Sequence, residues 1–504
     1  MKKNHLALFA MAIVLFLTAA FTAACSSPVS SPAEAPGGSG SDGGRPTTPD
    51  PVPSYYSITY NGNGNTAGSI PEDEATYESG KDIVTAAETG DLYKVGYRIN
   101  GWNTSSSGGG IHYDSGSQFT MGDGPVTLYA QWEPVYPVVK AGQNFTLFLK
   151  EDRNLYVTGH GLYGRLGLGS EDIQYTPVQV PVSGRVRTFG AGWDSAAAVM
   201  EDGRMLAWGN NDYAKLGIGT ENGNTSSPKE IASVNGTVSI ANGLYHTLFL
   251  TGSGELWAVG SRINGSSGDG TAGNPAGSRN SNVNPSFVTD NVASAAAGHD
   301  YTMVVKKNGS LWSAGAPGNG RQGSGATQNV VFLAENTSMG MDNAKVFAGT
   351  ETHTMVLKKD GSLWSTGNND NRQLGIGSNS ANSTSFKPVQ EYVNGTDASG
   401  GTQDMKDVAE VSLGTIHSMI LKNDGTLWAV GSNGDYRLGI QFSDARNAAF
   451  KVLDNVAHIA AGDNHTIAVK TDGTVWGAGA NRTGQFGNGR DNTGRTWTEI
   501  TEAQ

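Results

Sequence analysis

Alternating apolar and polar residues, broken by glycine-containing turns, fill the chain from residue 137 to its end. The stretch 353–367, "HTMVLKKDGSLWSTG", is typical: an apolar run, an Asp-Gly pair, and a second apolar run that carries a Trp. Alternation over a few residues predicts a half-buried β-strand, and Asp-Gly between two such runs predicts a tight hairpin because it supplies positive φ angles. We find no helix signal in this region and expect an all-β fold.

This hairpin occurs seven times, with a period near 50 residues. Each unit is expected to hold a Pro/Val strand, a strand that ends in a small-residue bend, an apolar strand and the Trp strand, followed by a glycine loop such as "YGRLGLG". A regular period of this length indicates stacked units, and four strands per unit predict propeller blades. We therefore predict a seven-bladed β-propeller over residues 137–504. The turn positions are Arg153, Gly203, Gly254, Gly309, Gly361, Gly425 and Gly473.

The two ends of the repeat region suggest how the ring closes. The first unit lacks a Pro/Val strand before it, and the last unit is followed by an extra strand, "TWTEIT" at Thr496–Thr501. A strand that completes the first blade would remove the free sheet edges at the junction. We predict that Thr496–Thr501 lies in the first blade, beside the strands of residues 138–159.

The repeats resemble a known family. The stretch 460–489, "AAGDNHTIAVKTDGTVWGAGANRTGQFGNG", is similar to the regulator of chromosome condensation repeat, and that resemblance implies the propeller fold. Departures are Phe145, Ser195 and Tyr301 at the family's His position, Arg153 at a turn glycine, and Leu206 at a Trp position. The remaining histidines are too far apart in sequence to suggest a metal site. We expect each to form a hydrogen bond within its own blade; they are His246, His353, His417 and His465.

Residues 55–133 form a different module, rich in Tyr and in Asn-Gly and Gly-Gly turns, with ten acidic and three basic residues. "GYRINGWNTSSSGGG" and the closing "VTLYAQW" resemble the Listeria–Bacteroides repeat, which is related to the internalin B-repeat. The resemblance implies a small β-grasp-like domain of bacterial surface proteins, used as a spacer or in adhesion. Trp102 and Trp132 could form a binding pair, but the core of the domain is the favoured place for them.

The N-terminus carries an export signal. Two lysines in Met1–Asn4 precede an apolar run that ends in small residues, which predicts a signal peptide over residues 1–24. Cys25, the single cysteine, follows "TAA" and resembles a bacterial lipobox, which implies lipidation of Cys25; ordinary cleavage after Ala24 is the alternative. By the same resemblance, Ser26 implies the outer membrane or cell surface. Residues 26–54 are dominated by Pro, Gly and Ser, which predicts a disordered tether.

Charge and motifs point away from several functions. Residues 134–504 hold 33 acidic and 28 basic residues with no basic stripe, which disfavours nucleic-acid binding. Three G-x-G-x-x-G strings, at 38–43, 159–164 and 318–323, lie outside any strand-to-helix unit and do not predict a nucleotide site. No catalytic motif stands out. We expect no enzyme activity, no cofactor and no bound metal.

The main functional interpretation is a surface-anchored, non-enzymatic protein of the bacterial cell envelope. Its propeller face is expected to bind a protein or a glycan. Two insertions, residues 265–284 and 391–406, are specificity loops or simply tolerated length. An exported enzyme inhibitor, similar to a propeller-type β-lactamase inhibitor, is the alternative. Guanine-nucleotide exchange is implied by the family resemblance alone, and export makes a small GTPase partner unexpected.

Overall fold

The computed structural model describes residues 52–90, 92–94, 96–270, 281–348, 352–377, 381–395, 400–441 and 445–500. Residues 53–504 belong to one compact unit. Among the described residues, no helix is both long and apolar enough to cross a membrane. The predicted signal peptide, Cys25 and nearly all of the tether lie outside the described residues.

The N-terminal module is a small β-domain. Its main sheet has the order β2-β1-β7-β4-β5, with the first and last long strands, β1 and β7, adjacent and parallel. Trp102 is fully buried and donates from Nε1 to the Ala87 carbonyl (2.8 Å), and Trp132 packs against the same core. The prediction of a core role is therefore confirmed. The strands are β1 (Tyr55–Asn61), β2 (Thr76–Glu78), β3 (Ile83–Thr85), β4 (Tyr97–Asn103), β5 (His112–Tyr113), β6 (Gln118–Thr120) and β7 (Val126–Pro134).

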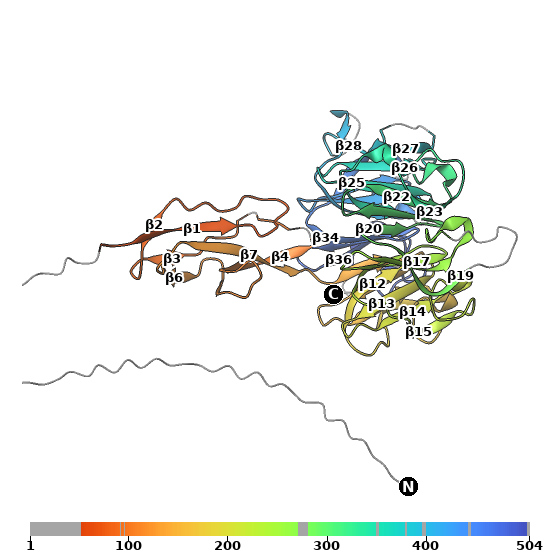
Figure 1. Ribbon diagram of the computed structural model, residues 1–504, viewed down its shortest axis with the longest axis horizontal. Coiled ribbons are helices and arrows are strands. Elements are labelled where there is room, and N and C mark those ends of the chain that lie inside the picture. Colours follow the sequence, from red (N-terminus) through yellow and green to blue (C-terminus); the bar gives the residue numbers. More distant parts are fainter. Residues whose placement is uncertain are drawn as a thin grey trace, which may run out of the picture. The chain divides into compact units, whose positions relative to one another are not determined.

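Seven four-stranded antiparallel blades follow, each with its strands paired in chain order. The predicted all-β propeller is confirmed (Figure 1). The first four blades are β8 (Val138–Ala141), β9 (Phe145–Leu149), β10 (Leu155–Gly159) and β11 (Gln174–Gln179); β12 (Val186–Ala191), β13 (Ser195–Met200), β14 (Met205–Gly209) and β15 (Thr225–Ile231); β16 (Thr237–Asn242), β17 (His246–Thr251), β18 (Leu256–Ser261) and β19 (Ser281–Thr289); and β20 (Val292–Ala297), β21 (Tyr301–Lys306), β22 (Leu311–Gly315) and β23 (Val330–Glu335).

The last three blades have the same order, and the sixth carries an additional hairpin, β28–β29, on the outer side of its sheet. Their strands are β24 (Asn343–Ala348), β25 (His353–Lys358), β26 (Leu363–Gly367) and β27 (Ser383–Pro388); β30 (Val408–Leu413), β31 (His417–Lys422), β32 (Leu427–Gly431) and β33 (Arg446–Leu453), with β28 (Gln390–Tyr392) and β29 (Thr402–Asp404); and β34 (Val456–Ala461), β35 (His465–Lys470), β36 (Val475–Gly479) and β37 (Gly494–Glu499).

The predicted closure by strand exchange is wrong. The C-terminal strand β37 pairs with β36 of the last blade, with Trp476 opposite Glu499 and Gly479 opposite Gly494. The Pro/Val strand therefore ends each blade rather than beginning it, and the first blade takes its own fourth strand, β11, from residues 174–179. The physical reason is local: the glycine loop returns the chain directly beside the Trp strand, so pairing with that neighbour needs only a short loop to close.

Side-chain packing closes the ring instead. Phe148 of the first blade lies in one buried cluster with Ile467, Val469 and Val475 of the last blade. Figure 1 shows these two blades, orange and blue, next to one another. Across the same junction, the Thr146 hydroxyl donates to the Gln485 carbonyl (2.7 Å). The junction is thus a blade-to-blade contact rather than a shared sheet.

The repeated histidines link neighbouring blades, so the expectation of bonds within one blade is wrong. Each ring Nε2 meets a hydroxyl of the following blade, and Tyr301, at the His position of the fourth blade, bonds Thr354 in the same way (2.9 Å). The pairs are His246 with Thr302 (2.8 Å), His353 with Ser418 (2.9 Å), His417 with Thr466 (3.1 Å) and His465 with Thr146 (3.1 Å).

These contacts fix the protonation of the rings. Each hydroxyl donates its own proton to a backbone carbonyl, as Thr302 does to Ser266 (2.7 Å) and Thr466 to Arg437 (2.8 Å). The hydroxyl oxygen must then accept from the ring, so Nε2 carries the proton. The four Nδ1 atoms are buried and have no hydrogen-bond partner among the described residues. A second proton would have no acceptor there, and burial lowers the pKa of His246 to about 4 and of His353 and His465 to about 3.

Candidate functional site

The two faces of the propeller carry different connections. One face, which we call the loop face, holds the turn between the first and second strands of each blade and the loop between the third and fourth. The hairpins between the second and third strands, and the connections between blades, lie on the opposite hairpin face, as the antiparallel strand order requires. The chain enters the first blade at Val138, on the hairpin face. The N-terminal module is therefore joined covalently to that face, and the loop face carries no connection to it.

In four blades the loop between the third and fourth strands is built on an asparagine at the same position. In the second blade, the Asn211 side-chain oxygen accepts from the Leu216 amide (3.1 Å), while its amide group donates to the Thr220 carbonyl (3.0 Å). This clamp fixes the loop backbone and so helps to position the side chains at its tip. Equivalent bonds join Asn369 to Leu374 (3.1 Å), Asn433 to Leu438 (2.9 Å) and Asn481 to Phe486 (2.8 Å).

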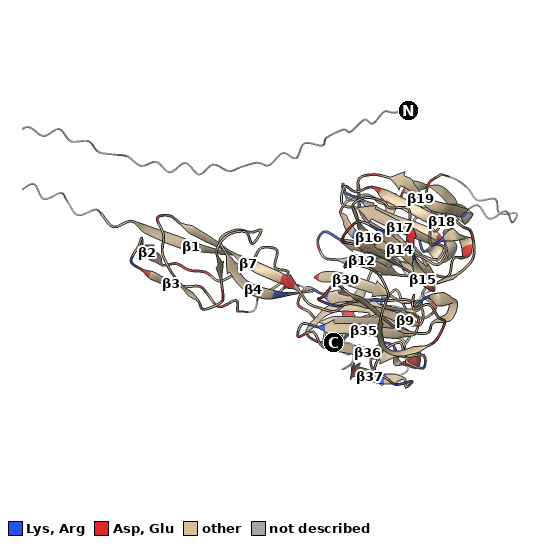
Figure 2. Ribbon diagram, turned by 90° about the horizontal axis from the view of Figure 1, so that it is seen from below, with Lys and Arg blue, Asp and Glu red and all other residues tan. Residues whose placement is uncertain are grey.

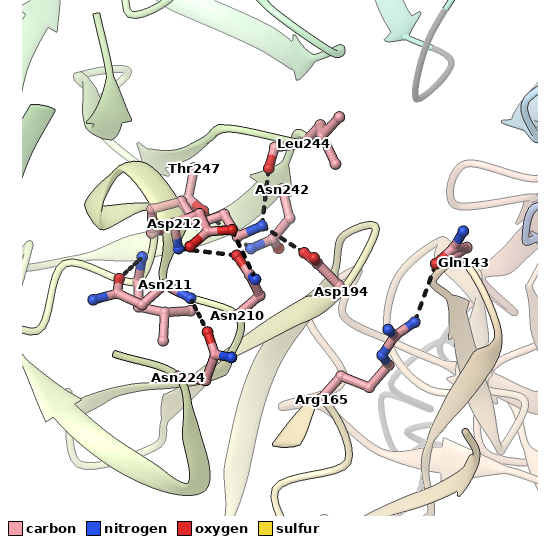
Figure 3. Close-up of polar contacts among 12 residues, drawn as sticks. Gln143, Arg165, Asp194, Asn210, Asn211, Asp212, Asn224, Asn242, Leu244 and Thr247 are labelled. Carbon is pink, nitrogen blue, oxygen red and sulfur yellow. Dashed lines mark hydrogen bonds and ion pairs between the residues drawn. The ribbon is translucent and has the colours of Figure 1, made fainter. Parts of the chain in front are cut away.

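A buried ion pair lies beneath the loop of the second blade. The Lys215 ammonium is 2.5 Å from Asp194 Oδ1 and donates to the Leu244 carbonyl of the third blade (3.0 Å). Figure 3 shows Asp194 and Leu244 on either side of this contact. Burial lowers the pKa of Lys215, although the Asp194 carboxylate opposes that shift. The second blade has Ser195 in place of the linking histidine, and this ammonium is one of its connections to the third blade; the Thr247 hydroxyl, which donates to the Lys215 carbonyl (3.0 Å), is another.

Three aromatic side chains from successive blades meet on the loop face. We call Tyr213, Tyr245 and His299 the aromatic cluster. The ring centroids of Tyr213 and Tyr245 are 4.7 Å apart, and those of Tyr245 and His299 are 4.8 Å apart. All three side chains are half-buried. Part of each therefore faces solvent, which makes the cluster a candidate contact surface.

The carboxyl group beside His299 is held ionised. Asn264 donates to Asp300 Oδ2 (3.2 Å), and the Arg321 guanidinium is ion-paired with the same carboxylate. Burial alone would raise the pKa of Asp300, but the contacts with His299, Arg321 and Asn264 outweigh it and lower the pKa below its ordinary value. The polar groups next to the aromatic cluster are thus fixed in position and charge.

Tyr213 occupies a backbone conformation that a tyrosine rarely adopts. It is the middle residue of the short turn η2 (Asp212–Ala214) and has φ 63° and ψ 21°. Tyr163, in η1 (Leu162–Gly164), has φ 62°. Non-glycine residues are costly in this left-handed region, and Asn and Asp are the best tolerated. Three other blades use such residues at the same position: Asn264 in η3 (Ile263–Gly265), Asn319 in η4 (Gly318–Gly320) and Asp435 in η7 (Gly434–Tyr436).

The two tyrosines are therefore candidate functional residues, since strain kept at a surface loop is a reason to examine the side chain for a function. The conformation itself is not unique to them, because Ala214 (φ 59°), Arg372 (φ 64°) and Tyr436 (φ 63°) adopt it one position later in their loops. We expect Tyr163→Asn to raise the free energy of unfolding by about 0.5–1 kcal/mol, because Asn tolerates the left-handed conformation better. The reciprocal change, Asn264→Tyr, should lower it by a similar amount. Urea unfolding of the two variants measures both effects, and a loss of stability in Tyr163→Asn would contradict the strain argument.

The innermost strands of the blades surround a cavity of about 500 Å³, lined mainly by Ala, Gly, Ser and Val. Its charged residues are Lys140, Lys345 and Glu410, with Lys345 Nζ 3.4 Å from Glu410 Oε1. Burial would raise the pKa of Glu410, but the two lysines and His458 outweigh it, so the pKa is lowered. This is the arrangement of a structural ion pair. Within the described residues, no group of three His, Cys, Asp or Glu side chains could hold a metal ion.

The two predicted specificity insertions lie on opposite faces. Residues 391–406 connect two blades on the hairpin face, and residues 265–284 belong to a third-to-fourth-strand loop on the loop face. Part of the insertion 391–406 is structural, because Glu391 is buried and ion-paired with Lys422 (2.5 Å), and Met405 is fully buried. Residues 271–280 and 396–399 lie outside the described residues, as does the predicted lipidation site, Cys25.

Family models match both folded parts of the chain. The Listeria-Bacteroides repeat domain matches residues 56–131, close to the predicted 55–133. Two models of the regulator of chromosome condensation repeat match residues 184–214 and 456–485, and residues 202–250 and 360–421. The propeller contains regulator of chromosome condensation repeats. These repeats account for the recurring His, Asp-Gly and Trp positions described above.

Known proteins with this repeat propeller differ in activity. The chain is 27% identical to the ultraviolet-B receptor UVR8 of Arabidopsis thaliana over 320 residues, which cover 61% of this chain and 68% of the receptor. It is 25% identical to the human E3 ubiquitin-protein ligase HERC2 over 311 residues, 60% of this chain and 6% of that protein. A receptor and a ligase thus carry similar repeats, so the repeats alone do not assign an activity to this chain.

Solved structures share the propeller fold. Yeast regulator of chromosome condensation, solved bound to Kap60, has a TM-score of 0.59 and 20% identity, covering 73% of this chain and 85% of that one. Human WBSCR16 has a TM-score of 0.60 and 16% identity, covering 69% of this chain and 94% of that one. At these identities the likeness shows the fold alone.

Proposed function

We propose that this chain is a non-enzymatic binding protein that uses the loop face of its propeller to hold a protein or glycan partner at the bacterial cell surface. The observation that carries the proposal is the aromatic cluster of Tyr213, Tyr245 and His299, which is partly exposed on the loop face. Aromatic side chains supply large contact area at low entropy cost and are enriched where proteins bind partners. The module and tether are joined to the opposite face, which supports the loop face as the one turned toward a partner.

Capture from extracts tests this proposal. The purified full chain is immobilised and exposed to host and bacterial-surface extracts, in parallel with Tyr245→Ala. The matched control is Tyr175→Ala, which removes a tyrosine of the first blade that is 38% exposed. We expect the wild type and the control to retain the same partner and Tyr245→Ala to lose most of it, since hot-spot aromatics contribute about 2 kcal/mol or more. Equal capture by all three proteins would refute binding through this face.

The envelope location rests on the N-terminal segment. Acylation of Cys25 would give a stable anchor, because a lipoprotein carries more than one acyl chain and each buried CH₂ contributes about 0.8 kcal/mol. We expect the full chain, exported in a bacterial host, to partition into the detergent phase and Cys25→Ala to partition into the aqueous phase. Appearance of both proteins in the aqueous phase would contradict the anchor and leave the binding proposal to be judged by the capture experiment.

A further inference from the structure

The geometry of the loop face points to a cationic partner: we propose that the aromatic cluster binds exposed Lys or Arg side chains of a protein. This inference rests on the proposed function and specifies the chemistry of the partner. An ammonium or guanidinium group is attracted to the face of an aromatic ring, by about 0.5–2 kcal/mol depending on how far it is desolvated. The aromatic cluster supplies such rings from three neighbouring blades.

Four tryptophans in the third strands of the blades already have a cation of the same chain over their rings. In four blades a lysine of the preceding strand lies over the Trp ring, whereas no ammonium or guanidinium of the described residues lies over the ring of Tyr213. The ring of Tyr213 is thus available to a cation from outside, unlike that of Tyr163, which has the Arg165 guanidinium 5.7 Å from its centroid. The occupied pairs are Lys306–Trp312 (5.6 Å), Lys358–Trp364 (5.0 Å), Lys422–Trp428 (4.8 Å) and Lys470–Trp476 (4.6 Å).

The charges of this part of the loop face favour a cation. Asp212, next to Tyr213, is exposed, and its carboxylate accepts from the Asn210 side chain (3.2 Å), as Figure 3 shows. Glu171 and Asp172, on the neighbouring loop of the first blade, are also exposed. None of these three acids forms a salt bridge with a described residue.

The described basic residues of the third-to-fourth-strand loops in the first four blades all contact the propeller itself; among them, Arg262 is ion-paired with Asp269 (2.8 Å) and remains partly exposed. Arg165 and Lys215 are each 2% exposed and Arg321 is 9% exposed, and all three contact groups of the propeller itself. Asp212, Glu171 and Asp172 therefore face solvent, whereas three of the four basic side chains are withdrawn from it and the fourth is ion-paired, so the local field attracts positive charge. The acidic and basic positions along the chain are coloured in Figure 2.

Ring orientation favours a charged side chain over a sugar. The plane of Tyr245 is inclined by 59° to that of Tyr213 and by 79° to that of His299. Stacking on a sugar needs one flat and open platform, whereas an ammonium group needs only ring faces and carboxylates directed at one point. The inclined rings of the aromatic cluster do not form such a platform, and the exposed Asp212 carboxylate next to Tyr213 supplies a charge that an ammonium group can pair with.

Binding of defined probes to the purified full chain tests the inference. The probes are a fluorescent peptide of alternating Lys and Ser, the same peptide with Glu in place of Lys, and a labelled neutral glucan oligomer, each followed by fluorescence anisotropy. We expect the Lys peptide alone to bind, and to bind more weakly as salt is raised. Tyr213→Asn and Asp212→Asn should each weaken it about fivefold or more. Asn suits the left-handed conformation at residue 213, so the first variant is expected to fold normally.

The matched control is Asp472→Asn, which makes the same change in net charge on the hairpin face and keeps the turn hydrogen bonds to Thr474 (2.9 and 2.7 Å). It should bind the Lys peptide like the wild type. Preference for the Glu peptide or the glucan, no binding of the Lys peptide, or equal weakening by Asp472→Asn would each overturn the inference. If those results came together with loss of capture by Tyr245→Ala, the proposed function would stand and only the cationic partner would be wrong.

Discussion

Phe148→Ala is expected to lower the free energy of unfolding by about 3–5 kcal/mol, which is the usual cost of removing a fully buried phenylalanine. Phe148 is completely buried at the junction of the first and last blades, in one cluster with Ile467 and Val475. Because no strand crosses this junction, packed side chains carry most of its stability. The loss should appear as a lower midpoint in urea unfolding followed by tryptophan fluorescence.

A matched substitution shows whether the closing junction equals the others. Phe249 occupies the same position in the second strand of the third blade and is 1% exposed, packed against the second blade. If the ring is closed throughout, Phe249→Ala and Phe148→Ala should cost similar free energy. A cost below about 1 kcal/mol for Phe148→Ala alone, against several for Phe249→Ala, would mean that the junction is open in solution.

Acid is expected to unfold the propeller well above the pH at which carboxylates titrate. Burial holds the pKa of His246 at about 4 and that of His353 and His465 at about 3, whereas a histidine in the unfolded chain has its ordinary value of 6.5. Below that value the unfolded chain binds protons that the folded chain does not, so stability falls as the pH falls. Above about pH 7 both states are neutral at these residues, and their contribution to the pH dependence vanishes.

The expected size of the effect is large because several rings act together. Each buried neutral histidine removes about 1.4 kcal/mol per pH unit between its folded and unfolded pKa values. Three or four of them would remove much of a typical domain stability over one or two pH units. Thermal unfolding between about pH 7.5 and about pH 5 should show the decline, and a constant melting temperature over that range would contradict the buried neutral state.

One variant separates the histidines from other titrating groups. Tyr301 shows that a tyrosine at this position can make the same link to the next blade, through its hydroxyl and Thr354 (2.9 Å). His246→Tyr is therefore expected to fold. Its stability should fall less steeply as the pH falls, because its unfolded chain takes up one proton fewer than that of the wild type. A slope equal to that of the wild type would mean that His246 does not contribute.

Much of the fold could be predicted because its signals are local. Asp-Gly turns and alternating apolar strands define the hairpins, and counting the turns predicts seven blades. The blade boundary could not be found in this way, because a Pro/Val strand between two hairpins can belong to either. The histidine partners were missed for a similar reason: Thr302 lies 56 residues beyond His246, and only the ring arrangement brings them together.

The candidate site can be predicted from the sequence only in part. The aromatic cluster joins residues of three blades, so no single sequence motif predicts it. One signal was present nevertheless: aligned loops place Tyr163 and Tyr213 where Asn264 and Asn319 stand in other blades. A bulky residue at a position that favours Asn suggests that the side chain is needed. Comparison among repeats of one chain can therefore reveal functional positions.

Closure without strand exchange also bears on how such a protein can be rearranged. Each blade is one uninterrupted stretch of chain, from β8–β11 to β34–β37, so one continuous coding segment specifies one complete blade. An in-frame duplication of one repeat adds an entire sheet with all its hydrogen-bonded neighbours. A circular permutant that opens the chain between two blades leaves every sheet intact, whereas a propeller closed by a shared blade has to break one. Ring size and terminus position are therefore free to change in this architecture without dividing a sheet.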